Sequence, residues 1–532
     1  MILVFIISRS ILITGPLQYI DDDRAVEGLM SKHMLKGAPL PVFVYGIHYA
    51  GGATVSVYIS ALFIYLFGLS ASTFKFYSLL VATAFLSLLF CFLRKKFDDK
   101  AAIFGSLLVL FSMESFTRLS LKIPGYMFMM MSHIIIVSLF LTIFFEKKKK
   151  PFNSFDYVIL GMLTVLCFWI SESVVPIIVS MIVFWYISDK LFILRKNFWI
   201  YISSSTLSFV PLLVYNLNNK FANIKHLFVE SPVHWLVCKY DLFPDLVYCI
   251  DPIHKGTNNI VSFFTSDLPN HFSGQWAYYI IFLLSFAVAI YLYRDDLWKL
   301  TKGLIPKRSF SVELKNIKKE AFIISYSLFF LFTYYSRGMG KTSYFLLGYT
   351  FMIITISIVI RDLIINKSHK VKLAGYSMLA IVIISGFTST ASIEAHPELK
   401  LYPEVTKRLM SDNISYAYAD FSIKWPIIFY SDEEVIASCE GMCHCLGEGR
   451  KPKYPPYESA VNSSERFAYI LRKGSRFQED LSGFLENNSM PHKEESVGNM
   501  MIYILDEGPR PRQVVSDCYS NRYFMLPKEK SR

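Results

Sequence analysis

Long apolar runs, separated by short basic clusters, dominate the sequence. An α-helix needs about 20 such residues to cross the hydrocarbon core of a bilayer. The pattern therefore predicts an α-helical polytopic membrane protein. The charge-poor runs lie near residues 1–14, 52–70, 74–93, 99–113, 127–145, 156–171, 174–188, 198–215, 277–293, 321–335, 345–360 and 373–390.

Basic residues between the runs set the expected orientation of the spans. Clusters such as Arg94 to Lys96 and Lys147 to Lys150 should face the cytoplasm. Alternation of the spans from residue 74 onward then leaves residues 391–532 outside. The run at 52–70 either crosses the membrane, which puts the preceding loop in the cytoplasm, or lies along the outer surface, which puts that loop outside. Its lack of charged residues favours a crossing.

The first run, Met1 to Thr14, is too short to cross a bilayer unaided and carries Arg9 in its middle. A charged segment before it and a small-residue cleavage site after it would identify a signal peptide, and the sequence shows neither. We expect part of this first span to lie upstream of Met1.

Composition agrees with a membrane protein. The 532 residues are 53% hydrophobic and 18% charged, whereas soluble domains carry about 25% charged residues. The net charge of +12 arises from 54 basic and 42 acidic residues. In a soluble chain this excess would raise the question of nucleic acid, but here the basic residues gather at the ends of apolar runs. We therefore expect membrane lipids, and no nucleic acid, among the partners.

Residues 391–532 differ in character from the rest of the chain. They are charged, richer in proline and glycine, and alternate short apolar strands with helical stretches. The pattern predicts a small α/β domain outside the membrane, after a transmembrane domain at residues 1–390. Its expected helices are Pro403–Ser411 and Phe477–Glu486, and its expected strands are Tyr416–Ala419, Val435–Ser438, Phe467–Leu471 and Met500–Leu505.

The loop after the first run, residues 15–73, carries an acidic cluster. Asp21, Asp22 and Asp23 follow the apolar run directly, so they lie at a membrane surface, where carboxylates are costly and commonly functional. Alternatively, they cap the helix that follows by accepting hydrogen bonds from its free N–H groups. Both roles stay open. The helix itself is predicted because apolar residues recur on one face, at Val26, Leu29, Met30 and Met34.

Polar residues in two short loops are candidate phosphate contacts. Arg337 and Lys341 flank glycines in the loop Ser336–Tyr344, a composition that suits a phosphate, although ordinary solvation explains it as well. This loop shares only Gly-Lys-Thr with a nucleotide-binding P-loop, which excludes that site. Arg118 and Lys122 in the loop 113–126 are similar candidates.

His48 and Tyr49 in the first loop are candidates for a sugar site, because imidazole and aromatic faces suit polyols. Interfacial anchoring is the alternative, particularly for Tyr49. A long, aromatic-rich loop at residues 216–276 is also expected outside the cytoplasm. Cysteines outside the spans favour disulfides over a zinc site in an oxidising compartment; they are Cys238, Cys249, Cys439, Cys443, Cys445 and Cys518.

The first loop resembles that of a known enzyme superfamily. The stretch Asp23 to Met30 (DRAVEGLM), the stretch Pro41 to Gly46 (PVFVYG) and the pair Phe67-Gly68 are similar to the first outer loop of the GT-C glycosyltransferases. These membrane enzymes include the protein O-mannosyltransferases and aminoarabinose transferases, and the closer likeness is to bacterial relatives of family 39, the dolichyl-phosphate-mannose type. The resemblance implies that 52–70 lies along the outer surface, with about eleven spans and the aspartates outside.

Other parts of the chain also resemble the superfamily. Pro124-Gly125-Tyr126 is similar to its second-loop Gly-Tyr, and the C-terminal segment resembles the soluble domain that some members carry. Three positions depart from the pattern: Arg24 stands where the family has a glutamate, Ser56 where a carboxylate is frequent, and Met127-Phe128 where an acidic residue follows Gly-Tyr.

The resemblance implies a chemistry and assigns roles. A sugar would pass from a polyprenyl-phosphate donor to a lipid, polysaccharide or protein acceptor, outside the plasma (inner) membrane. Asp23 would be the general base, with Asp22 as the second catalytic candidate, and Arg337 and Lys341 would hold the donor phosphate. No metal would be required, although three aspartates suit a divalent ion. The remaining candidate substrate contacts are Tyr45, His48, Tyr49, Arg118, Lys122 and Tyr126.

A non-catalytic transporter of polyprenyl lipids or polysaccharides, or a degenerate transferase, is the alternative. A transporter should show paired half-structures and charged residues within its spans. The sequence shows neither, which favours the transferase.

Overall fold

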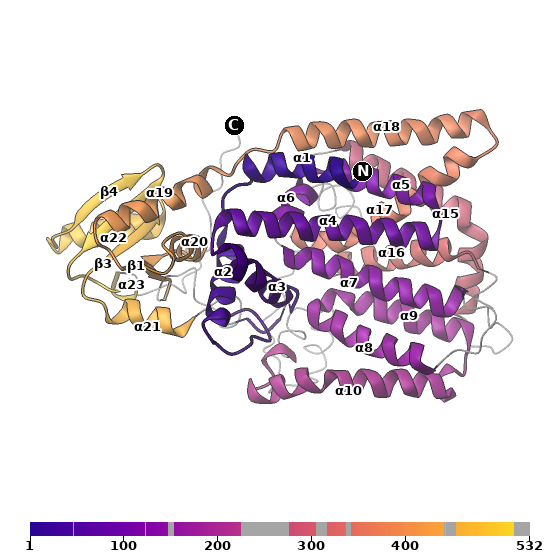
Figure 1. Ribbon diagram of the computed structural model, residues 1–532, viewed down its shortest axis with the longest axis horizontal. Helices are drawn as coiled ribbons and strands as arrows, with labels where there is room; N and C mark the ends of the chain where they lie inside the picture. Colours follow the sequence, from indigo (N-terminus) through magenta and orange to yellow (C-terminus); the bar gives the residue numbers. More distant parts are fainter. Residues whose placement is uncertain are drawn as a thin grey trace. The chain divides into compact units, whose positions relative to one another are not determined.

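Helices account for every predicted apolar run. The computed structural model (Figure 1) describes residues 1–45, 47–49, 51–122, 124–146, 154–224, 276–304, 317–336, 342–440, 442 and 454–514. The helices outside the C-terminal segment are α1 (Ile2–Thr14), α2 (Asp22–Leu35), α3 (Gly51–Phe67), α4 (Ala71–Lys96), α5 (Asp99–Leu110), α6 (Glu114–Lys122), α7 (Pro124–Leu141), α8 (Ser154–Ile170), α9 (Val175–Ser188), α10 (Lys196–Asn218), α15 (Trp276–Gly303), α16 (Lys319–Ser336), α17 (Thr342–Ile365) and α18 (His369–Ala391).

The chain forms two compact units that each combine separate stretches of sequence. The helical unit comprises residues 1–11, 49–55 and 78–393, and the mixed unit comprises residues 12–48, 56–77 and 394–532. Most of the first loop groups with the C-terminal segment in the mixed unit.

Six of the described helices are long and apolar enough to cross a membrane, by length and composition. They are α4, α7 with its extension to Phe145, α10, α15, the part of α17 from Gly348, and α18. The pair α5 and α6 passes the same test as a single span bent by 84°. The helices α1, α3 and α8 are apolar but shorter. These observations identify a multi-span helical protein and leave the expected number of eleven spans as a prediction.

The bend between α5 and α6 is stabilised by Arg9 of α1. A helix end leaves its last carbonyl groups without partners in the helix, and such groups are costly in an apolar environment. The Arg9 Nη2 donates to the carbonyl oxygens of Val109 (3.1 Å) and Leu110 (3.0 Å), and also to Ser112 Oγ (3.1 Å). The side chain is 1% exposed. Arg9 therefore closes the interrupted end of α5. The segment that follows, predicted as a loop at 113–126, is mostly the helix α6.

Glycines allow close helix contacts within the helical unit. A Cβ atom on Gly52 of α3 would lie 3.0 Å from the Gly125 carbonyl oxygen at the start of α7. A Cβ on Gly386 of α18 would lie 1.9 Å from the carbonyl oxygen of Phe111, directly after α5. The unit also packs α8 against α7 and α10, and α17 against α5, α16 and α18 (Figure 1).

The C-terminal part of the mixed unit is built on a five-stranded sheet in the order β2-β1-β3-β5-β4. The strands are β1 (Tyr416–Ala419), β2 (Ile436–Ser438), β3 (Phe467–Arg472), β4 (Lys493–Val497) and β5 (Met500–Leu505). Strands β2, β1 and β3 are parallel, while β5 is antiparallel to both β3 and β4. The helices of this segment are α19 (Pro397–Ser411), α20 (Phe421–Tyr430), α21 (Pro455–Ser463), α22 (Arg476–Asn487) and α23 (Pro511–Val514).

Alternating side chains along the strands bury both faces of this sheet. On one face, Tyr469, Tyr503 and their neighbours pack in one cluster with Leu481 and Leu485 of α22. Residues of opposite parity, such as Ala468 and Ile502, are also fully buried. The four predicted strands and both predicted helices are present. The helices α20, which contains Pro426, α21 and α23 and the polar edge strand β4 were not predicted from the sequence.

The close contact of Gly386 generates the first prediction. Gly386→Ala places a methyl group against backbone atoms that cannot move independently, so overpacking should destabilise the protein by about 1–3 kcal/mol. Thermal unfolding of the purified protein in detergent measures this effect. Gly483→Ala in α22 is the matched control, because nothing lies within 4 Å of its Cβ position; this substitution should stabilise slightly. Equal unfolding temperatures for both variants would contradict the packing described here.

Candidate functional site

The acidic cluster forms the first turn of α2, and its three members have different environments. Asp21 is the N-cap: its carboxylate accepts a hydrogen bond from the Arg24 backbone N–H at 3.0 Å, and it is 3% exposed. Asp22 is half-buried and Asp23 is exposed. The capping interpretation is therefore confirmed for Asp21. Asp23 is the most exposed of the three aspartates.

Helical spacing gives α2 two buried faces within the mixed unit. Residues four apart lie on the same face of a helix. Gly28 and Lys32 contact α20 and the turn after it: a Cβ on Gly28 would lie 2.8 Å from the Phe429 ring, and Lys32 Nζ lies 2.5 Å from an Asp432 carboxylate oxygen. A second set, Glu27 and Ser31, faces α3. The helix is thus enclosed on both sides, while Asp23 stays exposed.

Glu27 is a buried carboxyl group that the sequence analysis missed. It is 2% exposed, and its Oε2 accepts a hydrogen bond from Ser56 Oγ at 2.6 Å. Tyr77 O–H in turn donates to Ser56 Oγ at 3.2 Å. Burial raises the pKa of Glu27 to about 8; the Ser56 hydrogen bond opposes the rise and the nearby Asp23 charge adds to it. Glu27 is therefore mostly protonated at neutral pH, one helical turn from an exposed Asp23.

Glu27 bears on one of the three positions at which this sequence departs from the pattern of the family that it resembles. Ser56 stands where a carboxylate is frequent in the resembling proteins, yet the Glu27 carboxyl reaches this position from α2. The signal in the sequence was a glutamate four residues after Asp23, close to the apolar positions Val26, Leu29 and Met30. Lys75, the fifth residue of α4 and 5% exposed, is a second buried ionisable residue that was not singled out from the sequence.

Arg24 supplies positive charge beside the acidic groups. Its side chain is fully buried, and none of its three guanidinium nitrogens has a hydrogen-bond partner among the residues that the structure describes. Burial lowers the pKa of Arg24 to about 10, while Asp21, Glu27 and Asp23 oppose this shift. Arg24 thus remains a cation at neutral pH and balances part of the acidic charge.

The residues around Asp23 do not fit a bound divalent cation. The described part of the chain holds no group of three histidine, cysteine, aspartate or glutamate side chains that could bind a metal. The Arg24 guanidinium already occupies the neighbourhood of Asp21 and Asp23, and its charge would repel a metal ion. We therefore derive no step through a metal.

The structure gives Tyr45 and His48 different environments in the mixed unit. Tyr45 hydrogen-bonds through its hydroxyl to His33 Nδ1 at 2.9 Å and stacks on Tyr454 with ring centroids 4.7 Å apart. It therefore lies beside the C-terminal half of α2, away from the acidic turn along the helix. His48 is half-buried, and burial lowers its pKa.

Four other candidates belong to the helical unit. Arg118 pairs with Glu114 on α6 at 2.5 Å, and Lys122 lies in the last turn of that helix. Tyr126 lies in the first turn of α7, and Tyr49 precedes α3.

Arg337 and Lys341 lie outside the described residues, so their predicted role is untested. The same holds for five of the predicted extracytoplasmic cysteines, Cys238, Cys249, Cys443, Cys445 and Cys518. The sixth, Cys439, is disulfide-bonded, which confirms for this residue the preference for a disulfide over zinc.

Comparisons with known proteins identify the fold. No protein-family model and no curated protein matches the sequence. Among solved structures, ArnT from Cupriavidus metallidurans bound to undecaprenyl phosphate is similar with a TM-score of 0.55 and 11% identity, over 96% of this chain and 97% of that chain. The archaeal oligosaccharyltransferase AglB from Archaeoglobus fulgidus, in complex with an inhibitory peptide and a dolichol-phosphate, gives 0.53 and 11%, over 94% of this chain and 73% of that chain. Both are GT-C glycosyltransferases, so the predicted GT-C fold is confirmed.

The second prediction concerns the protonation of Glu27. The folded protein keeps a proton that the unfolded chain, with a glutamate pKa near 4.5, releases. The free energy of unfolding should therefore fall as the pH rises from about 4.5 to about 8. Glu27→Gln cannot ionise and keeps a hydrogen-bond acceptor for Ser56. It should become more stable than the wild type by roughly 2–4 kcal/mol at pH 8.

Thermal unfolding between pH 5 and 9 measures this difference. Glu404→Gln, at an exposed position on α19, is the control and should follow the wild-type curve. Parallel curves for Glu27→Gln and the wild type would mean that Glu27 is ionised in the folded protein.

Proposed function

We propose that this protein is a membrane glycosyltransferase that moves a sugar from a polyprenyl-phosphate donor to an acceptor outside the cytoplasm. The observation that carries the proposal is the fold, which extends over nearly the full length of ArnT, together with an exposed aspartate at the start of a rigidly held helix. The neighbours ArnT and AglB are complexed with undecaprenyl phosphate and dolichol-phosphate. A lipid-linked phosphate is accordingly the donor that we assign to this chain.

The transfer step needs a base for the acceptor. An acceptor hydroxyl oxygen attacks the anomeric carbon of the sugar, the bond from that carbon to the phosphate oxygen breaks, and polyprenyl phosphate leaves. The hydroxyl proton passes to a carboxylate. We assign this role to Asp23, because Asp21 is used as the N-cap and Asp22 is less exposed. A positioned base of this kind contributes about 10²–10⁴ to the rate.

Cations are needed to hold the donor phosphate and the charge of the leaving group. We assign Arg337 and Lys341 to this role, because Arg118 is already paired with Glu114. Lys122, Tyr126 and Tyr49 are proposed contacts of the donor, and His48 of the sugar. Tyr45 is the weakest of these candidates, since its hydroxyl and ring are engaged by His33 and Tyr454.

We further propose a plasma-membrane protein of about eleven spans, with the acidic turn and the C-terminal α/β segment outside. The placement of α3 along the outer surface is part of this proposal and rests on the resemblance of the first loop. The disulfide of Cys439 supports an oxidising compartment for the C-terminal segment. The acceptor is a lipid, polysaccharide or protein hydroxyl of the cell envelope.

The third prediction tests the base. Asp23→Asn should lower sugar transfer from polyprenyl-phosphate donors by about 10²-fold or more at unchanged expression and unfolding temperature, and Asp22→Asn should act less strongly. Asp506→Asn, at a position with an 87% exposed side chain, is the control. Radiolabel incorporated by purified protein in vesicles is the measurement. Full activity of Asp23→Asn would move the base to another carboxylate, and inactivity of the wild type with every donor would favour a transporter or a degenerate transferase.

The fourth prediction tests the phosphate contacts. Arg337→Gln and Lys341→Gln should each raise the KM for the lipid donor and lower kcat by about tenfold or more, because both the ground state and the leaving phosphate lose a positive charge. Arg118→Gln serves as the comparison. A larger effect of Arg118→Gln than of either loop variant would reassign the phosphate to α6.

A further inference from the structure

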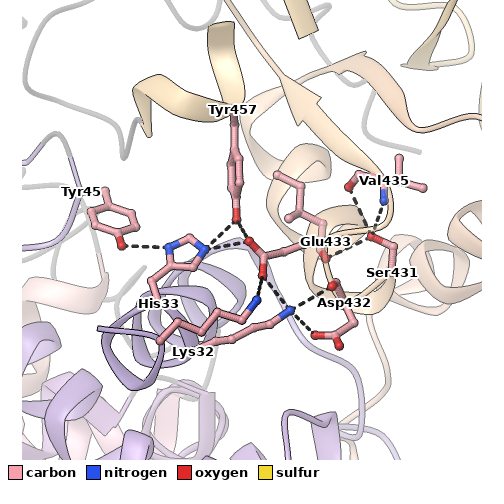
Figure 2. Close-up of polar contacts among 10 residues, drawn as sticks. Lys32, His33, Tyr45, Ser431, Asp432, Glu433, Val435 and Tyr457 are labelled. Carbon is pink, nitrogen blue, oxygen red and sulfur yellow. Dashed lines mark hydrogen bonds and ion pairs between the residues drawn. The ribbon is translucent and has the colours of Figure 1, made fainter. Parts of the chain in front are cut away.

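A polar cluster joins the C-terminal half of α2 to the turn after α20 (Figure 2). His33 Nε2 lies 2.7 Å from Glu433 Oε1, and Lys32 Nζ lies 2.6 Å from Glu433 Oε2. Tyr457 of α21 donates its hydroxyl to Glu433 Oε1 at 2.6 Å. On the other side of the imidazole, His33 Nδ1 bonds to the Tyr45 hydroxyl. A single carboxylate thus binds two side chains of α2 and one of α21.

The backbone of this turn is held in an uncommon conformation. Asp432 and Glu433 have φ angles of 51° and 75°, in the left-handed region that residues other than glycine seldom adopt. Ser431 stabilises the turn, because its Oγ accepts from the Val435 N–H at 3.1 Å and donates to the Ile428 carbonyl at 3.1 Å. Strained residues of this kind persist where the surrounding structure requires them and cluster at functional sites.

The Glu433 contact stays charged over the whole physiological pH range. Burial by itself would raise the pKa of the carboxyl, but hydrogen bonds from His33, Lys32 and Tyr457 hold that pKa well below its usual range. A carboxyl with a lowered pKa loses its stabilising contribution only when the pH falls through the lowered value. Glu433 therefore keeps its charge, and with it the ion pair to Lys32, throughout this range.

Two further contacts hold α2 along the same face. At its N-terminal end, the backbone N–H of Ile20 donates to the Tyr430 hydroxyl at 2.9 Å. Near its middle, Gly28 leaves room for the Phe429 ring. Together with Glu433, these contacts fix both the rotation and the axial position of the helix. Asp23 lies ten residues before His33, about 15 Å along the helix.

We propose that Glu433 and His33 are positioning residues for the transfer reaction, which hold the acid-bearing helix α2 so that Asp23 meets the acceptor hydroxyl. The inference rests on the proposed function and deepens it: the C-terminal segment is a working part of the transfer site. A C-terminal segment that served only to bind a ligand would not need to hold α2 in place. A displacement of about 1 Å at the reacting groups is enough to cost about 10² in rate, so loss of the contact reaches Asp23 through the helix.

The test compares Glu433→Gln with Glu434→Gln in the full-length protein. Glu434 is the neighbouring exposed residue in the same turn, so both variants remove one charge from one place. Glu433→Gln should lower kcat by about tenfold or more and leave the donor KM nearly unchanged, whereas Glu434→Gln should match the wild type. Tyr457→Phe removes one hydrogen bond from Glu433 and gives a milder variant, should Glu433→Gln fail to fold.

A double-mutant cycle identifies the partner. If Glu433 acts through His33, the double variant His33→Phe with Glu433→Gln should be no slower than Glu433→Gln alone, because the effects of contacting residues are not additive. Hydrogen exchange of the α2 amides, measured in parallel, should be faster in Glu433→Gln than in Glu434→Gln.

Each outcome is decisive. A fall in kcat with faster exchange in α2 supports the proposal. Faster exchange with wild-type kcat shows that Glu433 holds the helix only for stability and overturns the positioning role. A fall in kcat with unchanged exchange overturns it as well, because Glu433 would then act other than through α2. If the wild type transfers no sugar, the proposed function fails, and the exchange data still decide whether Glu433 holds α2.

Discussion

The burial of ionisable side chains on α2 is the constraint on which the mixed unit depends. Arg24 and Glu27 are both 2% exposed or less, and charged groups are buried only where neighbouring groups compensate them. Glu27 meets this requirement by holding a proton and a hydrogen bond to Ser56. For Arg24 the carboxylates of Asp21 and Asp23 offset the cost of burial only in part, because its guanidinium nitrogens have no hydrogen-bond partner among the described residues. A helix on the protein surface would keep its charged side chains in water and would need neither arrangement. The helix α2 is therefore better described as a core helix whose exposed acidic residue is Asp23.

This arrangement explains why the C-terminal segment and the first loop form one unit. The helix α20 and its following turn cover the face of α2 that carries Gly28 and Lys32, while α3 covers the face that carries Glu27 and Ser31. The helix α19 packs in turn against α20, and its Tyr402 is 2% exposed. An exposed carboxylate on a rigid support is the arrangement that the proposed proton transfer requires.

The spacing of apolar residues predicted most of the helices and strands. The geometry of the candidate site depends instead on contacts between residues far apart in the sequence. The apolar runs, the helix after Asp21 and four of the five strands follow from local spacing. The pairing of Glu27 with Ser56 and of His33 with Glu433 joins residues 29 and 400 positions apart, and no local pattern indicates either. The helix α20 was missed because Pro426 interrupts its signal, and α6 because nine residues are too few to show a clear helical period.

Transfer by the wild-type protein is the most direct test of the central claim. The purified chain, reconstituted in vesicles, would be supplied with radiolabelled polyprenyl-phosphate sugars and an envelope extract as acceptor, and with nucleotide sugars in a parallel reaction. The account predicts that label enters the acceptor fraction only from the lipid donors, with one free polyprenyl phosphate released for each sugar transferred. Intact lipid donors, or transfer from the nucleotide sugars alone, would contradict it.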